Sequence, residues 1–476
     1  MPIFKPLSMV LVACAIVGAA RSQARAQTAS SLSQQDRDAE VRQLRELVLK
    51  LQARVEQLEA HEHAVDPSAR KPSRSSAAAE SQAVAAPSAT PGTTAAAEGG
   101  VLDFLKATTI NLGIDTYYGY NFNHPIGRVN LLRAYDVSSN AFSLNQASVI
   151  LKNDPDVAAG RRFGARLDLQ FGQATSTLQG NPGNEPRPDV YRNIFQAYGT
   201  YVFPAGNGLT VDVGKWASSL GIENNYTKDQ MNYSRSYWFD FLPFYHMGAR
   251  VNYKFNDRVG FNYSVVNGTQ QVEPFNGFKD QFFGFVVQPH KTLSWTLNYY
   301  LGQEHPDVIF FTNGGAPPGA PRQQNVPFLP ITNAPSGKLH ILDSYATWQS
   351  TPKLTLALEG DYVIERLQEA SPPDHTSGGA VYSRYQLAPK IAVAGRAEYL
   401  SDRGGLFTGK TQALKEVTLT YEYKLAEGLL TRVEWRRDFS NQPFFFTDQL
   451  GVLSKHQTTA TLGLVWWWGN KMNESW

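Results

Sequence analysis

Alternation of apolar and polar residues runs from Val101 to the end of the chain, and it constrains the fold more than any other feature of the sequence. In 416–424, EVTLTYEYK, Val417 and Leu419 fall on one side while Glu416 falls on the other. The same period of two recurs in 163–170, 259–266 and 354–365. A two-residue period sustained over about ten residues predicts β-strands with one apolar face.

The connections between these segments alternate in length. Short connections are expected near 153–160, 204–208, 256–257, 289–291, 351–353, 388–390 and 425–428. Longer polar stretches, rich in Gly, Pro and Asn, occur at 121–141, 172–191, 217–243, 268–277, 305–337, 368–378, 402–412 and 440–455. Turns on one side and loops on the other are typical of an up-and-down transmembrane barrel, whereas a Greek-key sandwich need not show them. We therefore predict an all-β, antiparallel, up-and-down transmembrane barrel over 106–476, with about 16 strands counted to within two.

Strand length and hydropathy agree with a barrel in a membrane. The strands are close to the length that a tilted strand needs to cross hydrocarbon, and their polar faces carry charges, as a water-filled lumen requires. The mean hydropathy of −0.34 suits a wall of which half faces water. The segment 458–468 ends in Trp466 to Trp468 and resembles the C-terminal strand that outer-membrane insertion machinery recognises.

The first residues have the features of an export signal. Lys5 precedes an apolar run from Leu7 to Ala20, and Ala24 and Ala26 form a small-x-small cleavage site, which predicts a signal peptide over 1–26. Cys14 lies in a sequence that also resembles a lipoprotein signal, but the apolar run continues past it, so its lipidation stays open. Cleavage would leave a chain without cysteine, which suits an oxidising compartment.

A coiled-coil helix over 34–62 and a linker over 63–105 are expected to precede the barrel. The apolar heptad positions are Val41, Leu44, Val48, Leu51, Val55 and Leu58. Val at a and Leu at d favour a parallel dimer in isolated helices, and a larger assembly can override this, so we expect a homo-oligomer joined through barrel and coiled coil. An amphipathic helix lying on another surface remains the alternative. The linker is rich in Ala, Ser and Pro and has too few large apolar residues for a core.

Residues 404–411, GGLFTGKT, match the phosphate-binding P-loop pattern. A P-loop requires a buried strand before it and a helix after it. Alternating strand patterns flank the octet on both sides, so we interpret it as a loop and predict no nucleotide binding.

Charge and histidine placement suggest no other ligand. The net charge of +2 gives no support to a nucleic-acid partner. His61 and His63 alone make an incomplete metal site, and we predict neither a metal nor another cofactor. The nine histidines are scattered with no recognisable Ser–His constellation, so we do not expect an enzyme such as a barrel hydrolase.

The long connection 217–243 is the candidate pore constriction. It holds a dense group of aromatic residues, whose exposure in a surface loop would be costly, so we hypothesise that it folds into the lumen and narrows it. The constriction residues proposed are Asp229, Arg235, Tyr237, Trp238 and Asp240. Arg235 opposite Asp229 or Asp240 would set a field across the opening. The alternative is that the aromatics pack on the wall or form an interfacial belt and have no part in selection.

Charged residues on the polar strand faces are the candidate pore lining. They are Arg166, Asp168, Arg250, Lys254, Glu359, Asp361, Arg396, Glu398, Glu422, Arg432, Glu434 and Arg436. Both signs are present and many can pair across the wall, so no preference for cations or anions follows.

Four short stretches resemble one known family. Residues 234–250, SRSYWFDFLPFYHMGAR, together with 113–118, 221–223 and 266–268, are similar to the OmpL-like β-barrel porin-2 family of Gram-negative outer membranes. The resemblance covers most of 108–470 and implies a porin-like channel, but no particular solute.

The leading functional prediction is an outer-membrane porin through which small polar solutes diffuse passively, with the coiled coil in the periplasm. The alternative is a structural tether, anchored by the barrel, whose coiled coil binds the cell wall or a periplasmic partner. The linker is long enough for such a reach, since forty residues average roughly 35 Å as a coil.

Overall fold

The computed structural model describes residues 106–179, 185–311, 315–323, 325–472 and 474–476. The predicted signal peptide, coiled-coil helix and linker lie outside the described residues. Across the described ranges, no helix combines the length and the apolar character needed to cross a membrane.

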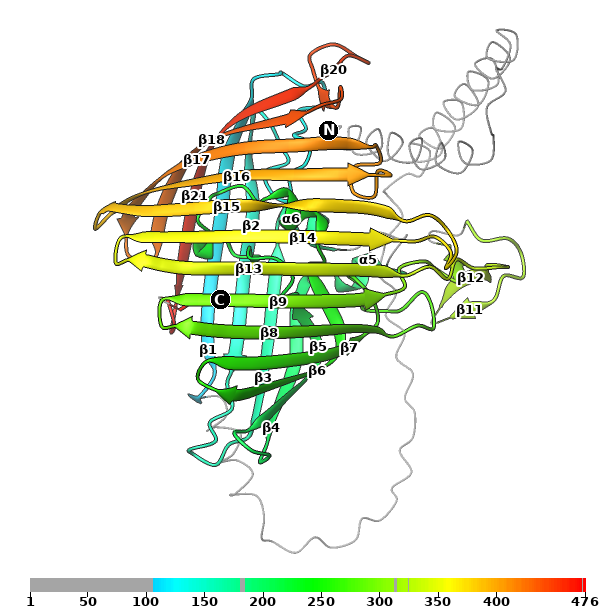
Figure 1. The fold of residues 1–476 in the computed structure, drawn as a ribbon, viewed down its shortest axis with the longest axis horizontal. Helices are drawn as coiled ribbons and strands as arrows, with labels where there is room; N and C mark the ends of the chain where they lie inside the picture. The colour runs from blue at the N-terminus through cyan, green and yellow to red at the C-terminus, as the bar shows by residue number, and fades with distance from the viewer. Residues whose placement is uncertain (1–105, 180–184, 312–314, 324, 473) are drawn as a thin grey trace, which may run out of the picture. The chain divides into compact units, whose positions relative to one another are not determined.

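Sixteen antiparallel strands close into one barrel in simple sequence order (Figure 1). They are β1 (Thr109–Asn121), β2 (Ala141–Asn153), β3 (Phe163–Phe171), β4 (Ile194–Phe203), β5 (Leu209–Ala217), β6 (Tyr245–Asn256), β7 (Val259–Val266), β8 (Asp280–His290), β9 (Leu293–Gly302), β13 (Leu339–Thr351), β14 (Leu354–Glu365), β15 (Asp374–Ala388), β16 (Ile391–Arg403), β17 (Gln412–Ala426), β18 (Leu429–Ser440) and β21 (His456–Gly469). The ring is completed by β1 and β21, which pair from Asn111 opposite Gly469 to Asn121 opposite Thr459. The predicted barrel and its strand number are confirmed.

The connections alternate as the sequence predicts. Each strand pair is joined in turn by a long connection on one side and a short one on the other, beginning with the long connection between β1 and β2. The long connections contain the short elements α4 (Ala174–Leu178), α5 (Pro188–Tyr191), η1 (Thr227–Asp229), α6 (Tyr237–Phe241), β10 (Val308–Phe310), β11 (Arg322–Gln323), β12 (Val326–Pro330), β19 (Phe445–Phe446) and β20 (Leu453–Ser454). We call the two sides of the barrel the loop side and the turn side.

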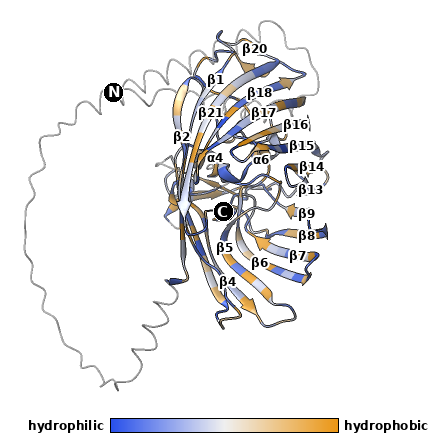
Figure 2. Ribbon diagram, turned by 90° about the vertical axis from the view of Figure 1, so that its left-hand side faces the viewer, coloured by the Kyte–Doolittle hydropathy of each residue, from blue (hydrophilic) through white to orange (hydrophobic). Residues whose placement is uncertain are grey.

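The two faces of each strand differ in polarity. Leu358 and Leu419 point outward and are 58% and 57% exposed, while their neighbours Glu359 and Thr418 are 2% and 0% exposed. Figure 2 shows the corresponding alternation of hydrophilic and hydrophobic residues along the strands. A barrel strand that separates lipid from water needs an apolar outward face and a polar inward face.

Near the loop side, the inward face of the wall is apolar like the outward face. The alternation of the sequence did not predict this. Five inward-facing residues of four strands are buried, namely Leu339, Ile341, Val363, Leu400 and Leu414. They pack with Trp238 and Leu242 of the connection between β5 and β6. This part of the wall is apolar because it meets protein and not water.

The P-loop-like octet lies between β16 and β17, which are antiparallel neighbours. The Asp402 carboxylate accepts the Thr408 N–H at 2.7 Å, and Gly404 has a φ of +95° that suits glycine. A strand follows the octet where a P-loop would have a helix.

Candidate functional site: the loop inside the barrel

The connection between β5 and β6, residues 218–244, extends into the barrel, and we call it the inner loop. Glu434 on β18 accepts the backbone N–H groups of Tyr233 and Ser234 at 2.6 and 2.9 Å. Glu398 on β16 accepts the N–H of Tyr237 at 2.8 and 2.9 Å. Since β5 and β6 lie far from β16 and β18 in the ring, the loop crosses the lumen to reach the opposite wall.

Local sequence explains the shape of the inner loop. Ser236 is the N-cap of α6, and its hydroxyl accepts the Phe239 N–H at 3.0 Å. Asn224 makes a turn by accepting the Tyr226 N–H at 2.9 Å. Trp238 is fully buried in the apolar cluster described above.

Arginines of the wall bind the carbonyl groups of the inner loop. Arg396 donates to the carbonyl oxygens of Ser234 and Arg235 at 2.8 and 3.1 Å. Arg436 donates to the Arg235 carbonyl at 2.5 Å, and Arg432 donates to the Thr227 carbonyl at 2.7 Å. Together with the two glutamates, these side chains satisfy backbone groups that the loop cannot pair within itself.

These three arginines, together with Arg133, form buried ion pairs under the inner loop. The pairs are Arg396–Glu416 at 2.7 Å, Arg436–Asp438 at 2.9 Å, Arg432–Glu422 at 2.8 Å and Arg133–Asp438 at 2.7 Å. Except for Glu422, all of these side chains are 0–1% exposed. Buried charges require such pairing, because an uncompensated charge away from water is strongly destabilising.

Three of the five predicted constriction residues are buried in the packing of the inner loop. The Arg235 guanidinium donates to the carbonyls of Tyr233 and Asn225 at 2.8 and 3.1 Å, and it lies 5.0 Å from the Tyr135 ring centroid. Tyr237 donates its hydroxyl to Asp438 at 2.8 Å. Burial raises the pKa of Tyr237 well above its usual range, so the hydroxyl stays a donor.

Arg235 forms no ion pair with Asp229 or Asp240 among the described residues. The loop places carbonyl oxygens around the guanidinium, and these satisfy its donors instead. Asp229 pairs with Lys228 at 2.7 Å and accepts the Trp476 N–H at 3.0 Å. Burial raises the pKa of Asp240 to about 6, opposed by the charge of Arg436.

The segment after β21 contacts the inner loop from the turn side. The Lys228 ammonium lies 4.6 Å from the centroid of the Trp476 ring, and Tyr226 meets that ring edge-on with centroids 5.6 Å apart. The inner loop is therefore held from the loop-side wall and from this segment.

The predicted lining residues fall into two groups. The first is buried, most of it in contact with the inner loop, and comprises Asp168, Glu359, Asp361, Arg396, Glu398, Arg432, Glu434 and Arg436. The second keeps partial exposure towards the turn side and comprises Arg166, Arg250, Lys254 and Glu422. In this second group Arg166 pairs with Asp168 at 2.8 Å and Arg250 with Asp212 at 2.9 Å, whereas Lys254 is exposed.

The predicted lining omits several buried charges of the interior. Glu416 and Asp438 follow the same two-residue phase as Glu422 and Arg436, and the phase could have revealed them. Arg133 lies in the connection between β1 and β2, and nothing in the local sequence indicates that it folds inward to Asp438.

A closed antiparallel barrel with an apolar exterior, a charged interior and a long connection folded into its lumen is the architecture of an outer-membrane porin. The sequence matches the family model "Putative beta-barrel porin-2, OmpL-like" over residues 107–466. The chain belongs to this family, as its sequence motifs indicate.

Solved structures of other proteins align with most of this chain at low sequence identity. OprB of Pseudomonas putida aligns with a TM-score of 0.50 at 13% identity, covering 78% of this chain and 97% of that one. DcaP of Acinetobacter baumannii aligns with a TM-score of 0.48 at 8% identity, covering 76% and 97%. An anion-selective porin from Comamonas acidovorans aligns with a TM-score of 0.48 at 10% identity, covering 76% and 99%. Comparison with curated protein sequences gives no match.

Proposed function

We propose that this protein is an outer-membrane porin that lets small polar solutes diffuse passively through its lumen, with the inner loop as the constriction. The observation that carries the proposal is the fixation of the inner loop: charged side chains of β16 and β18 hold its backbone across the lumen. An inner loop that is fixed in this way narrows the lumen permanently. Solutes would pass through the part of the lumen that the loop does not fill.

The predicted constriction and lining residues have different roles in this proposal. Arg235, Tyr237 and Trp238 fix the shape of the inner loop, because they are fully buried in its packing. Asp229 and Asp240 keep partial exposure and contact the solute. On the turn side, the partly exposed residues Arg166, Arg250, Lys254 and Glu422 line the wider part of the path.

We also propose that the chain acts as a homo-oligomer with its short turns facing the periplasm. Bacterial barrels place their short turns on that side. Because β1 begins on the turn side, the predicted coiled coil would lie in the periplasm and could join subunits there. Cross-linking of the purified full-length protein, compared with a variant lacking 34–62, tests the coiled-coil contribution.

Single-channel recording in planar bilayers tests the channel. The full-length protein is expected to give discrete openings, and deletion of 226–240 is expected to raise conductance. Deletion of 315–323, in the long connection between β9 and β13, is the matched control and is expected to leave conductance unchanged. An absence of openings in the folded wild type would refute the channel, and equal conductance of the 226–240 deletion would refute the constriction.

Reversal potentials under a salt gradient test the solute-contacting residues without a deletion. Asp240→Asn removes one partly exposed acidic group from the inner loop, so the selectivity is expected to move towards anions above pH 6. Asp257→Asn, at the exposed turn between β6 and β7, is the control for a change of charge alone.

A further inference from the structure

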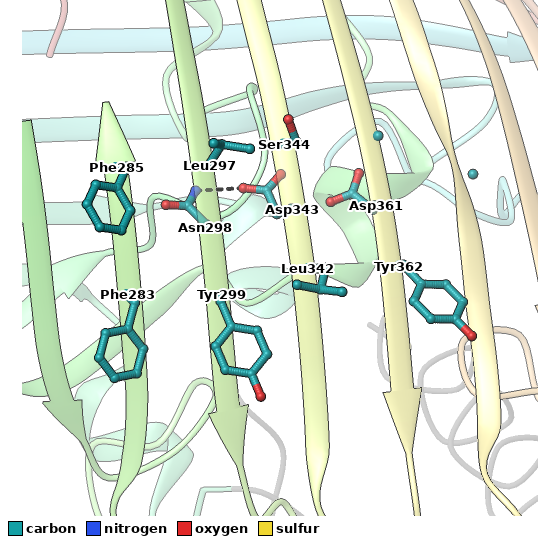
Figure 3. A pocket seen from close by; sticks show the side chains of 12 residues that line it. Phe283, Phe285, Leu297, Asn298, Tyr299, Leu342, Asp343, Ser344, Asp361 and Tyr362 are labelled. Atoms are coloured by element: carbon teal, nitrogen blue, oxygen red, sulfur yellow. Dashed lines mark hydrogen bonds between the residues drawn. The ribbon is translucent and has the colours of Figure 1, made fainter. Parts of the chain in front are cut away.

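Three carboxylates gather on the inner wall of β13 and β14, outside the arginine-rich region under the inner loop. Asp343, Glu359 and Asp361 are 2%, 2% and 6% exposed. Each offers an oxygen that lies within 4.8 Å of the oxygens offered by the other two. Asp343 and Asp361 are direct neighbours across the two strands and lie side by side in Figure 3.

These carboxylates differ from the arginine-paired acids of the interior in having no cationic partner. Asp438, Glu416 and Glu422 each pair with at least one arginine. Among the described residues, no arginine, lysine or histidine forms an ion pair with Asp343, Glu359 or Asp361. Three acidic groups buried together in this way repel one another, and the wall offers nothing positive to offset the repulsion.

Unpartnered oxygens provide a second, independent observation. Both carboxylate oxygens of Asp361 are buried and have no hydrogen-bond donor in the described structure, and the same is true of Asp343 Oδ1. The other Asp343 oxygen accepts the Asn298 amide at 2.6 Å. Glu359 accepts the Ile222 N–H at 2.9 Å and the Tyr382 hydroxyl at 2.8 Å. The donors around the cluster therefore orient Asp343 and Glu359, and the Asp361 carboxylate faces the other two acids without a donor from the wall.

We propose that Asp343, Glu359 and Asp361 bind a divalent, oxygen-preferring cation, with Ca²⁺ as the best match. Calcium accepts carboxylates in flexible geometry at about 2.3–2.6 Å, so ligand oxygens on opposite sides of the ion stand up to about 5 Å apart. Magnesium requires shorter, near-octahedral contacts, and zinc favours His and Cys ligands, which the cluster lacks.

The site would also fasten the first part of the inner loop. Glu359 already holds Ile222, and Asn298, which is bonded to Asp343, donates to the Ser219 carbonyl at 2.8 Å. A cation that fixes these carboxylates therefore fixes the start of the inner loop from β13 and β14, a different part of the wall from β18, which carries Arg432 and Arg436. This inference concerns binding and stability, and it does not depend on the proposed channel activity.

The test uses the full-length protein, purified in detergent free of lipopolysaccharide and treated with a chelator. Added Ca²⁺ is expected to raise the midpoint of thermal unfolding in a saturable way, and Mg²⁺ is expected to do so at concentrations at least tenfold higher. Terbium, as a luminescent probe of calcium sites, is expected to show sensitised emission through the nearby Tyr382, reversed by Ca²⁺.

Asp361→Asn removes the carboxylate that has no other partner. The variant is expected to fold, since no hydrogen bond is lost, and to weaken Ca²⁺ binding at least tenfold. Asp212→Asn is the matched control, because that acid is buried and paired with Arg250, and it is expected to keep the Ca²⁺ response. The proposal is overturned if the wild type shows no saturable Ca²⁺ response, or if Asp361→Asn responds like the wild type. It is also overturned if Asp361→Asn is more stable than the wild type without any calcium effect in either, since the carboxylates would then share protons.

Discussion

Both carboxylate oxygens of Glu398 accept the backbone N–H of Tyr237, at 2.8 and 2.9 Å. Tyr237 is the first residue of α6, and the N–H groups at the start of a helix have no partner within it. A wall residue thus supplies the partner for a loop residue 161 positions earlier in the sequence. The inner loop is ordered by the barrel around it, and changes in the wall should alter the passage.

Replacing Glu398 by alanine should loosen the inner loop. The Tyr237 N–H would remain buried without an acceptor, which costs about 1–3 kcal/mol of folding free energy. We expect single-channel currents with a larger mean conductance and more open-state noise than in the wild type. Glu427→Ala, at an exposed turn, should change neither quantity. Wild-type currents from a folded Glu398→Ala variant would contradict the role assigned to this contact.

Replacing Arg436 by methionine should destabilise the barrel. The change leaves Asp438 and Glu416 with one arginine each and removes one of the two arginine donors to the Arg235 carbonyl, so we expect a loss of about 3 kcal/mol in the free energy of unfolding. Urea unfolding of protein reconstituted in vesicles measures this difference. Lys390→Met removes an exposed cation at a turn and should stay within about 0.5 kcal/mol of the wild type.

Arginine substitutions on the outer face of β17 should show which part of this strand lies in the hydrocarbon of the membrane. Leu419 lies near the middle of the strand and Leu425 near its turn-side end, and they are 57% and 43% exposed. Leu419→Arg should cost about 2–4 kcal/mol in vesicles, and Leu425→Arg about 0–1 kcal/mol. Equal costs at both positions would show that β17 does not cross the hydrocarbon as the barrel requires.

The stability of a contact between two long connections should depend on pH through Glu185. Its carboxylate is buried and accepts the Val272 N–H at 2.6 Å, and burial raises its pKa from 4.5 to about 7. The folded state therefore binds the proton more tightly than the unfolded state, so this contribution to stability is complete below pH 4.5 and is lost as the pH rises towards 7.

Glu185→Gln tests this dependence because glutamine stays neutral. Its thermal unfolding midpoint should match that of the wild type near pH 4.5 and exceed it near pH 8. If the difference between the two unfolding midpoints is the same at pH 4.5 and pH 8, the ionisation of Glu185 does not contribute to the pH dependence of stability.

The strand architecture could be predicted because its cause is local. Val417, Leu419 and Tyr421 alternate with Glu416 and Thr418, and lipid on one side and polar surroundings on the other impose that pattern wherever the strand lies in the ring. The assignment of the octet 404–411 to a loop between two strands is confirmed for the same reason, because the alternation in its flanks is local.

The contacts of the inner loop could not be predicted in detail, because their cause is distant in sequence. The aromatic content of 217–243 indicates that the segment needs to be covered, but not by which strands. Glu434 and Tyr233 are 201 positions apart, and only the closed ring brings them together. The loop covers Leu339 and Ile341 as well, which makes inward positions apolar where a water-filled interior would make them polar.

The pairing of β1 with β21 limits when the barrel can close during assembly. Ile114 lies opposite Trp466, so the first strand of the barrel has no partner on one side until the last strand has been delivered. Until then one row of backbone groups on β1 is open to pairing with other chains. Assembly therefore cannot be finished while the chain is still being exported, and the exposed edge must be protected during transit until both ends reach the membrane.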